Sequence, residues 1–220
     1  MARRGLHGQI VEAIARRILS GDIQEGETLN LQALRTELEV SLTALREALK
    51  VLSAKGIVDA RQRRGTFVRP RADWNVLDIE VIGWQLSDRH SKQMLENVHE
   101  LRMIIEPVAA RLAAERATGD DISAIDAAIA RMADAGDVAT LIESDLLFHR
   151  LLMATTGNDL IKRLDVIIET DVAERIRAVI GPRANYAVRG HYAVLVAIRA
   201  RDPDAAEDAV RDLIRDLEGG

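Results

Sequence analysis

The stretch SLTALREALKVLSAKGIVDARQRRGTFV, residues 41–68, contains the pattern that decides the fold of the first third of the chain. Ser41 stands where a helix N-cap is expected, and Gly56 stands where the helix should end. Between them, leucines recur every three or four residues, as on one face of an α-helix. These leucines are Leu42, Leu45, Leu49 and Leu52. Two short apolar runs around a basic, glycine-containing turn follow, which predicts a β-hairpin.

Two further helices are expected before this stretch. Apolar residues fall at helical spacing over 9–19, and Gly21 follows them. A second, shorter helix is expected over 31–38, with Asn30 as its N-cap. Three helices followed by a hairpin describe a winged helix-turn-helix, whose third helix enters the major groove of DNA. Residues 1–70 are therefore predicted to be a DNA-binding domain.

The face of the third helix opposite its leucines is polar. We expect this face to contact base edges, while the basic hairpin turn, or wing, meets phosphates or the minor groove. The candidate DNA-binding residues are Thr43, Arg46 and Lys50 on the helix, and Arg61, Arg63, Arg64 and Gly65 in the turn. A polar helix face alone is more often just solvated, but the ordered set of three helices and a basic hairpin favours DNA binding.

Charge supports the same division of the chain. The 220 residues carry a formal net charge of -5, which by itself argues against a nucleic-acid-binding protein. Residues 1–71, however, contain 13 basic and 8 acidic side chains, whereas residues 72–220 contain 17 and 27. A net-positive first third on an acidic remainder is typical of a DNA-binding domain joined to a domain with another task.

Composition narrows the classes of protein further. Cysteine is absent, so disulfides, thiolate metal sites and thiol nucleophiles are excluded. Aromatic residues make up only 3% of the chain while hydrophobic residues reach 48%, which favours packed helices over a β-sandwich. No apolar run approaches the roughly 18 to 20 residues that cross a bilayer. We expect a cytoplasmic protein without a membrane partner.

After an expected linker at 71–76, every segment shows helical periodicity, and residues 77–220 are predicted to form an effector-binding and dimerisation domain. The expected helices are 77–87, 91–118, 121–134, 138–156, 158–180, 184–200 and 203–218. The fold class is therefore mainly α: a winged helix-turn-helix followed by an all-helical bundle of about six to seven helices.

Several polar residues lie on helix faces that should point inward. Asp145 and His149 are one turn apart among apolar neighbours, and His191 and Arg102 lie on the apolar faces of two other helices. Because burying an unpaired charge is costly, we expect these four side chains to meet each other, a metal or a ligand. Asp145, His149 and His191 could ligate one cation. A surface ion pair or a hydrogen-bonded core histidine remains an alternative.

Many of these residues also resemble a known family, the GntR-type bacterial transcription regulators. The resemblance to their DNA-binding domain rests on GETLN (26–30), VS (40–41), Thr43, LREAL (45–49), GIV (56–58) and RGTFV (64–68). Two residues depart from the family pattern. Leu42 stands where the recognition helix usually has an arginine, and Glu39 stands where the preceding turn usually has a glycine. Arg46 and the wing arginines should therefore contribute more of the DNA recognition.

The rest of the chain resembles the FCD ligand-binding domain of the fatty-acid-regulator subfamily. The matching residues are Leu101-Arg102, Glu106-Pro107, AARLAAERA (109–117), Asp145, Phe148-His149, Gly157-Asn158 and His191. The resemblance implies a divalent metal, zinc with nickel or manganese as alternatives, held by an aspartate and histidines and used to bind a small carboxylic acid. Asp145, His149 and His191 match three of the ligands. Leu213 stands where a fourth, a histidine, is expected.

The segment WNVLD (74–78), continuing to Trp84, is similar to the linker of galactonate-operon repressors within this subfamily. The resemblance implies a sugar-acid effector such as an aldonate. Arg102 would pair with its carboxylate, and Asn185 and Tyr192 would bind its hydroxyls. The prediction is a homodimeric repressor that releases double-stranded operator DNA when the effector binds. A metal-dependent hydrolase and a metal-free dimerisation module are the alternatives.

Overall fold

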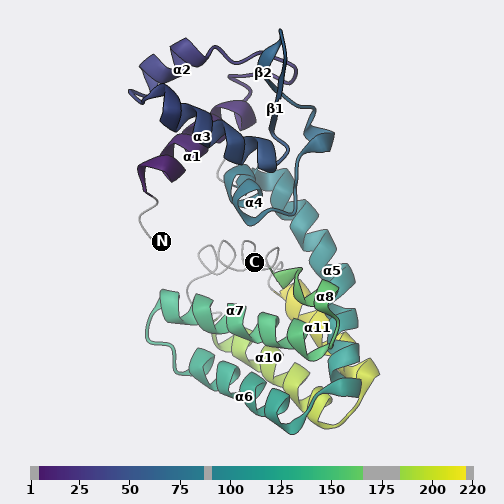
Figure 1. Cartoon of the computed structure of the whole chain (residues 1–220). Coiled ribbons are helices and arrows are strands. Elements are labelled where there is room, and N and C mark those ends of the chain that lie inside the picture. Colours follow the sequence, from purple (N-terminus) through teal and green to yellow (C-terminus); the bar gives the residue numbers. More distant parts are fainter. Residues whose placement is uncertain (1–4, 87–90, 166–183, 217–220) are drawn as a thin grey trace. The chain divides into compact units, whose positions relative to one another are not determined.

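The computed structural model describes residues 5–86, 91–165 and 184–216, and it divides into two compact units, Met1–Met94 and Leu95–Gly220 (Figure 1). The first unit contains α1 (Leu6–Leu19), α2 (Leu31–Glu37), α3 (Leu42–Ala54), β1 (Val58–Arg61), β2 (Gly65–Val68), the 3-10 turn η1 (Arg71–Asp73) and α4 (Ile79–Leu86). Helix α5 (Ser91–Arg116) begins at the end of the first unit. The second unit also contains α6 (Gly119–Ala133), α7 (Val138–Thr155), α8 (Asp159–Lys162), α10 (Ala184–Arg199) and α11 (Pro203–Asp216).

The expected helix caps of the first unit are confirmed. The Asn30 side chain accepts hydrogen bonds from the backbone amides of Gln32 and Ala33, which begins α2. The Ser41 hydroxyl accepts one from the amide of Ala44, which begins α3. These side chains satisfy amides that have no partner within the helix, so the sequence itself defines where both helices start.

The predicted hairpin is also confirmed. Strands β1 and β2 pair antiparallel, with Val58 opposite Val68 and Arg61 opposite Gly65. Residues 26–29 lie along the other edge of β2, where the Leu29 amide donates to the Thr66 carbonyl at 2.8 Å. The wing is therefore supported along both edges of β2.

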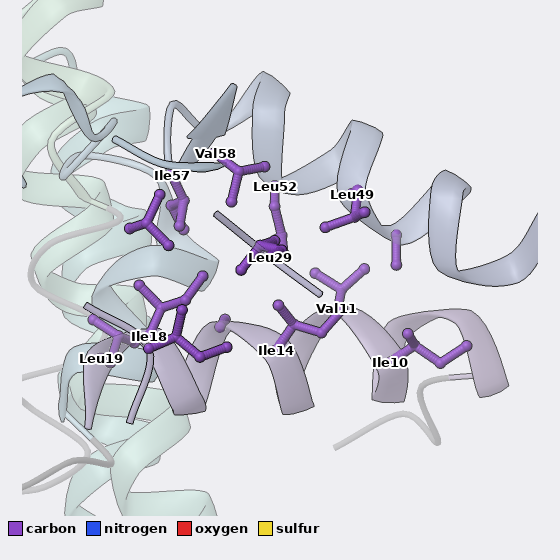
Figure 2. Packing of buried hydrophobic residues seen from close by; sticks show 14 of the residues in the cluster. Ile10, Val11, Ile14, Ile18, Leu19, Leu29, Leu49, Leu52, Ile57 and Val58 are labelled. Carbon is purple, nitrogen blue, oxygen red and sulfur yellow. The ribbon is translucent and has the colours of Figure 1, made fainter. Parts of the chain in front are cut away.

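The core of the first unit forms between α1 and α3. Figure 2 shows the apolar side chains of α1 facing Leu49 and Leu52 of α3, with Leu29, Ile57 and Val58 between the helices. Ile14, Leu45 and Leu52 are completely buried. Burial of this many aliphatic side chains stabilises the three-helix arrangement, because each contributes on the order of 1.5 to 3 kcal/mol.

The segment expected to be a linker is packed into this same unit. The indole of Trp74 is buried and donates to the Arg69 carbonyl at 3.0 Å. Val81 and Trp84 of α4 belong to the same hydrophobic core as α1 and α3. The structure thus places α4 with the DNA-binding unit, whereas the sequence pattern assigned residues from 77 onward to the helical domain.

Lys55, at the end of α3, connects the recognition helix to the start of α4. The residue is 9% exposed, and its Nζ lies 2.8 and 2.7 Å from the two carboxylate oxygens of Asp78. The same Nζ lies 2.9 Å from an oxygen of Glu80. Asp78 also accepts hydrogen bonds from the backbone amides of Glu80 and Val81, so this one carboxylate caps α4 and pairs with α3.

Replacing Asp78 with asparagine should reveal this ion pair through its pH dependence. Burial raises the pKa of Asp78, but the hydrogen bonds and charge of Lys55 outweigh burial and hold that pKa below its ordinary value of 3.8. A lowered pKa in the folded state means that the ion pair stabilises the unit above pH 3.8 and is lost as the pH falls below it. Asparagine can still cap α4, so the variant loses only the charge.

The measurement can report on the first unit alone, because both tryptophans of the chain, Trp74 and Trp84, lie in it. Urea unfolding followed by tryptophan fluorescence should show the variant to be less stable than wild type by roughly 1 kcal/mol at neutral pH. The difference should shrink toward zero in acid. A difference that stays constant across this range would contradict the ion-pair explanation.

The second unit is a bundle in which α10 packs against α6 and α11, and α6 packs against α7. Its core includes Phe148, Leu152, Leu195 and Ile198, all completely buried. The continuous helix expected over 158–180 is wrong in its first part, because α8 ends at Lys162 and a turn follows. This bend lets Ile161 and Leu164 pack against Ala109 and Met153. Most of the rest of the expected helix lies outside the described residues.

Among the described residues, no helix is long and apolar enough to cross a membrane. This finding fits the absence of long apolar runs from the sequence.

Candidate functional site

Two helices of the second unit bring three potential metal ligands together. Asp145 and His149 lie one turn apart on α7, and His191 lies on α10. All three are buried, with exposed fractions of 4%, 1% and 0%. One ligand atom from each lies within 4.8 Å of the others, and His191 Nε2 is 3.1 Å from Asp145 Oδ1. The prediction that these inward-facing polar residues meet is confirmed.

The environment of this cluster suits a divalent cation. Phe148 packs edge-on against both imidazoles, with ring centroids 5.2 Å from His149 and 4.5 Å from His191. Burial raises the pKa of Asp145, but the nearby His191 outweighs burial and holds that pKa below its ordinary value. The carboxylate is therefore ionised, as a metal ligand must be. Two imidazole nitrogens and one carboxylate oxygen form a set that zinc, nickel and manganese accept.

Glu106 on α5 is a further member of this site that sequence reasoning missed. It is completely buried, and its Oε2 lies 2.8 Å from His149 Nδ1. Its Oε1 accepts a hydrogen bond from Arg102 Nε, one turn earlier on the same helix. Burial raises the pKa of Glu106, but Arg102 and His149 together lower it to about 2. The i,i+4 spacing of Arg102 and Glu106 was the available signal.

The predicted effector-binding residues have different locations. Arg102 is 2% exposed, and its Nη2 lies 3.5 Å from His149 Nε2, so it belongs to the cluster. The Asn185 side chain lies outside the described residues. Tyr192 is 48% exposed and lies at the surface near Arg199. It follows His191 directly, and successive helical residues point about 100° apart. Its side chain is therefore not part of the buried cluster.

The residues expected to contact DNA lie at the surface of the first unit. Thr43, Arg46 and Lys50 are exposed along one face of α3, while Leu45 and Leu49 are buried on the other. Lys50 Nζ lies 2.7 Å from a carboxylate oxygen of Glu47 on the same face. The face is therefore available for base and phosphate contacts, as the helical spacing predicted.

The wing arginines are exposed but differ in their surroundings. Arg64 donates a hydrogen bond to the Gly26 carbonyl at 2.9 Å, and its guanidinium carbon lies 3.6 Å from the ring centroid of Phe67. Arg64 therefore supports the wing as well as offering charge. Arg63, at the tip, has a φ of +69°. This left-handed conformation is uncommon for a residue with a Cβ atom.

Comparisons with known proteins agree with this arrangement. Residues 6–68 match the bacterial regulatory proteins of the gntR family, and residues 97–216 match the FCD domain. The galactonate operon transcriptional repressor of Escherichia coli is 33% identical over 211 residues, which cover 94% of this chain and 92% of that protein. The chain belongs to the GntR family of bacterial transcription regulators.

Other matches extend over similar lengths. The transcriptional repressor NanR of Cronobacter sakazakii is 29% identical to this GntR regulator, over 96% of this chain and 83% of that protein. Among solved structures, a GntR protein of Streptococcus agalactiae has a TM-score of 0.55 at 24% identity and covers 97% of this chain and 100% of its own. Lar of Listeria monocytogenes has a TM-score of 0.66 at 16% identity and covers 99% and 96%.

Family membership decides between two of the functional alternatives. The family and the named relatives are transcription regulators, so this GntR regulator is not an enzyme, and the hydrolase alternative is wrong. One of the two departures from the family pattern also gains a structural context. Glu39, in place of the usual glycine between α2 and α3, has a φ of +53°, the conformation that glycine adopts without strain.

Replacing Arg63 with glycine should change stability and DNA affinity in opposite directions. Glycine adopts the left-handed φ without strain, which stabilises the folded state, but it also gives the unfolded chain more conformational entropy. The net rise in the free energy of unfolding should be a few tenths to about 1 kcal/mol. The same change removes a charge at the wing tip, which should weaken DNA binding severalfold whatever the DNA sequence.

Arg63→Ala is the matched control, because it removes the charge but keeps the strain. Fluorescence anisotropy with the protein's own promoter DNA should show similar losses of affinity for both variants, whereas tryptophan-monitored urea unfolding should show a gain for glycine alone. If DNA binding is unchanged in both variants, Arg63 does not contact DNA.

Proposed function

We propose that this GntR regulator represses a sugar-acid catabolic operon in the cytoplasm and releases its operator when a small carboxylic acid binds at a metal centre in the FCD domain. The buried cluster of Asp145, His149 and His191 is the observation that carries this proposal. A buried carboxylate beside two imidazoles is costly unless it serves a purpose such as cation binding. The 33% identity to a galactonate operon repressor supports an aldonate or related acid as the effector.

Asp145, His149 and His191 would hold the metal, and zinc fits their donor set, with nickel and manganese as alternatives. The bound ion would supply a Lewis-acidic centre with open positions for a carboxylate oxygen. Arg102 reaches the same cluster and could pair with the carboxylate, since a guanidinium can hold it through two parallel hydrogen bonds. Asn185 and Tyr192 remain candidates for contacts with effector hydroxyls.

On the DNA side, we propose that the regulator acts as a homodimer whose two winged units bind the half-sites of a pseudo-palindromic operator. Thr43, Arg46 and Lys50 would contact base edges and phosphates, and Arg61, Arg63, Arg64 and Gly65 would contact the backbone or minor groove. Binding would be steeply salt-dependent, because most of its affinity comes from neutralised phosphates. An effector that prefers the released arrangement by ~1 to 3 kcal/mol would weaken operator binding by roughly 5- to 150-fold.

A thermal-shift screen tests the effector proposal. Wild type and His149→Ala would be heated with aldonates, other sugar acids and dicarboxylates, each with zinc and after chelation. We expect a sugar acid to raise the melting temperature of metal-loaded wild type, and to have no effect after chelation or on the variant. An acid that stabilises the chelated protein equally would contradict the role of a metal.

A metal-free cluster remains the second candidate, because His191 Nε2 already lies 3.1 Å from Asp145 Oδ1. In that case the FCD domain would serve dimerisation, and the three side chains would only satisfy each other. Elemental analysis of purified wild type and His149→Ala decides the question. One equivalent of metal in wild type that is absent from the variant supports the metal centre, and none in either supports the hydrogen-bonded cluster.

A further inference from the structure

The ring of His149 lies between two carboxylates that come from different helices. Its Nδ1 is 2.8 Å from Glu106 Oε2 on α5, a separation too short for a nitrogen lone pair to face a carboxylate oxygen. Its Nε2 is 3.5 Å from Asp145 Oδ2 on α7. Glu106 and His149 are each at most 1% exposed. Water therefore has little access to either ring nitrogen, and the nearby protein groups decide which nitrogen carries a proton.

A neutral imidazole has one N–H and one nitrogen lone pair, and a carboxylate can only accept hydrogen bonds. Glu106 is a carboxylate that pairs with the Arg102 guanidinium through Oε1 and faces His149 Nδ1 with Oε2. The nitrogen that faces it must therefore carry the proton. The lone pair is then left on Nε2, which lies on the side of Asp145 but, at 3.5 Å from its Oδ2, is beyond the distance of a normal hydrogen bond. Arg102 Nη2, which can only donate, lies 3.5 Å from the same nitrogen, so Nε2 is the atom available to bind a cation.

We propose that Glu106 is a positioning residue that holds His149 as the Nδ1–H tautomer and directs the Nε2 lone pair toward Asp145 and His191. Only its consequence for metal affinity rests on the proposed metal centre. The tautomer itself is a property of the metal-free protein. Nothing in the sequence pattern separates this role from that of an ordinary helical glutamate.

Arg102 makes this arrangement stable. It pairs with Glu106 from one turn away on the same helix, and the two charges compensate each other inside the protein. Because Arg102 is already compensated by Glu106, the negative charge of Asp145 remains available to attract a cation. The pair on α5 therefore orients His149 without neutralising the ligand set on α7 and α10.

The first test reads the tautomer without any metal. Histidine side-chain ¹⁵N shifts at mildly alkaline pH distinguish a protonated nitrogen from one with a free lone pair, and His149→Gln assigns the signal. Wild type should show His149 protonated at Nδ1. The double variant Arg102→Met with Glu106→Leu, which removes both charges together, should shift the ring toward the Nε2–H form. An unchanged tautomer in the folded double variant would overturn the proposal.

The second test compares two double variants that differ only in the acceptor at position 106. Arg102→Met with Glu106→Gln keeps an oxygen that can accept from Nδ1–H, whereas Arg102→Met with Glu106→Leu leaves that N–H without a partner. Zinc affinity, measured by competition with a chromophoric chelator, should be 10- to 100-fold weaker in the leucine variant than in the glutamine variant. Equal affinities in the two folded proteins would show that Glu106 has only a charge-pairing role.

The half-buried pair of Arg111 on α5 and Glu207 on α11 provides a control. Replacing it with methionine and leucine should leave zinc affinity unchanged, since it lies outside the cluster. The two tests separate the two proposals. A tautomer shift in a protein that binds no zinc would support the positioning role and reject the metal centre. Zinc affinity that is the same with and without a hydrogen-bond acceptor at position 106 would support the metal centre and reject the positioning role.

Discussion

Alanine at position 56 should unfold the DNA-binding unit under conditions where wild type is stable. Gly56 ends the segment after α3 with a φ of +75°, which strains any residue that has a Cβ atom. A Cβ at this position would lie 2.5 Å from the carbonyl oxygen of Asp73 and 3.4 Å from Trp74 Cα. These are backbone atoms, so the clash cannot be relieved by rotating a side chain. Strain and displacement together should cost about 3 kcal/mol or more.

The displaced segment is held from several directions, which is why the effect should be large. The Asn75 amide donates to the Lys55 carbonyl at 2.9 Å, and the buried Trp74 indole donates to Arg69. Moving Asp73 away from position 56 would disturb both bonds and the junction with α4. Loss of operator binding at the temperature of unfolding should follow, because the recognition helix α3 is part of the same cooperative unit.

Gly21→Ala is the matched control. Gly21 has a similar φ of +82°, but no heavy atom lies within 4 Å of the point that an alanine Cβ would occupy there. It should therefore show the strain alone, about 1 kcal/mol. Urea unfolding followed by tryptophan fluorescence measures both variants in the same unit. Equal losses at positions 21 and 56 would mean that the contact with Asp73 carries no cost.

The first unit could be predicted almost completely, because its signals are local. Caps at Asn30 and Ser41, leucine spacing and the glycine-containing turn depend on neighbours in the chain. The position of α4 could not be predicted in this way. Its packing depends on contacts of Val81 and Trp84 with helices far earlier in the chain. The spacing of apolar residues predicts a helix, but it does not indicate into which of the two hydrophobic cores the helix packs.

The candidate site was predictable to a similar degree. Helical spacing placed Asp145, His149 and His191 on inward faces, and tertiary packing then brought them together. Glu106 was missed because a glutamate within a helix is usually solvated, and only its contact with His149 shows otherwise.

Histidine at position 213 should strengthen metal binding. Leu213 occupies the place where the resemblance to FCD domains implies a fourth ligand, and it is 2% exposed. Its Cδ1 lies 2.8 Å from where a Cβ on Gly190 would be, directly before His191. A fourth imidazole would complete a tetrahedral set, so the zinc dissociation constant of Leu213→His should fall on the order of tenfold or more.

The metal-free form of this variant should be less stable than wild type, because a buried leucine is replaced by a polar ring in a close-packed site. The rise in melting temperature on adding zinc should therefore be larger than for wild type. Calorimetric titration with zinc and thermal unfolding with and without zinc measure both effects.

Ile214→His tests whether position matters, since Ile214 is 1% exposed on the same helix but points about 100° away. It should lose stability without gaining zinc affinity. A second comparison adds Leu213→His to His191→Ala, which restores three protein ligands and should recover part of the affinity that His191→Ala loses. If Leu213→His binds zinc no more tightly than Ile214→His, residue 213 does not face the cluster. The site of Asp145, His149 and His191 would then differ in geometry from that of four-ligand FCD domains.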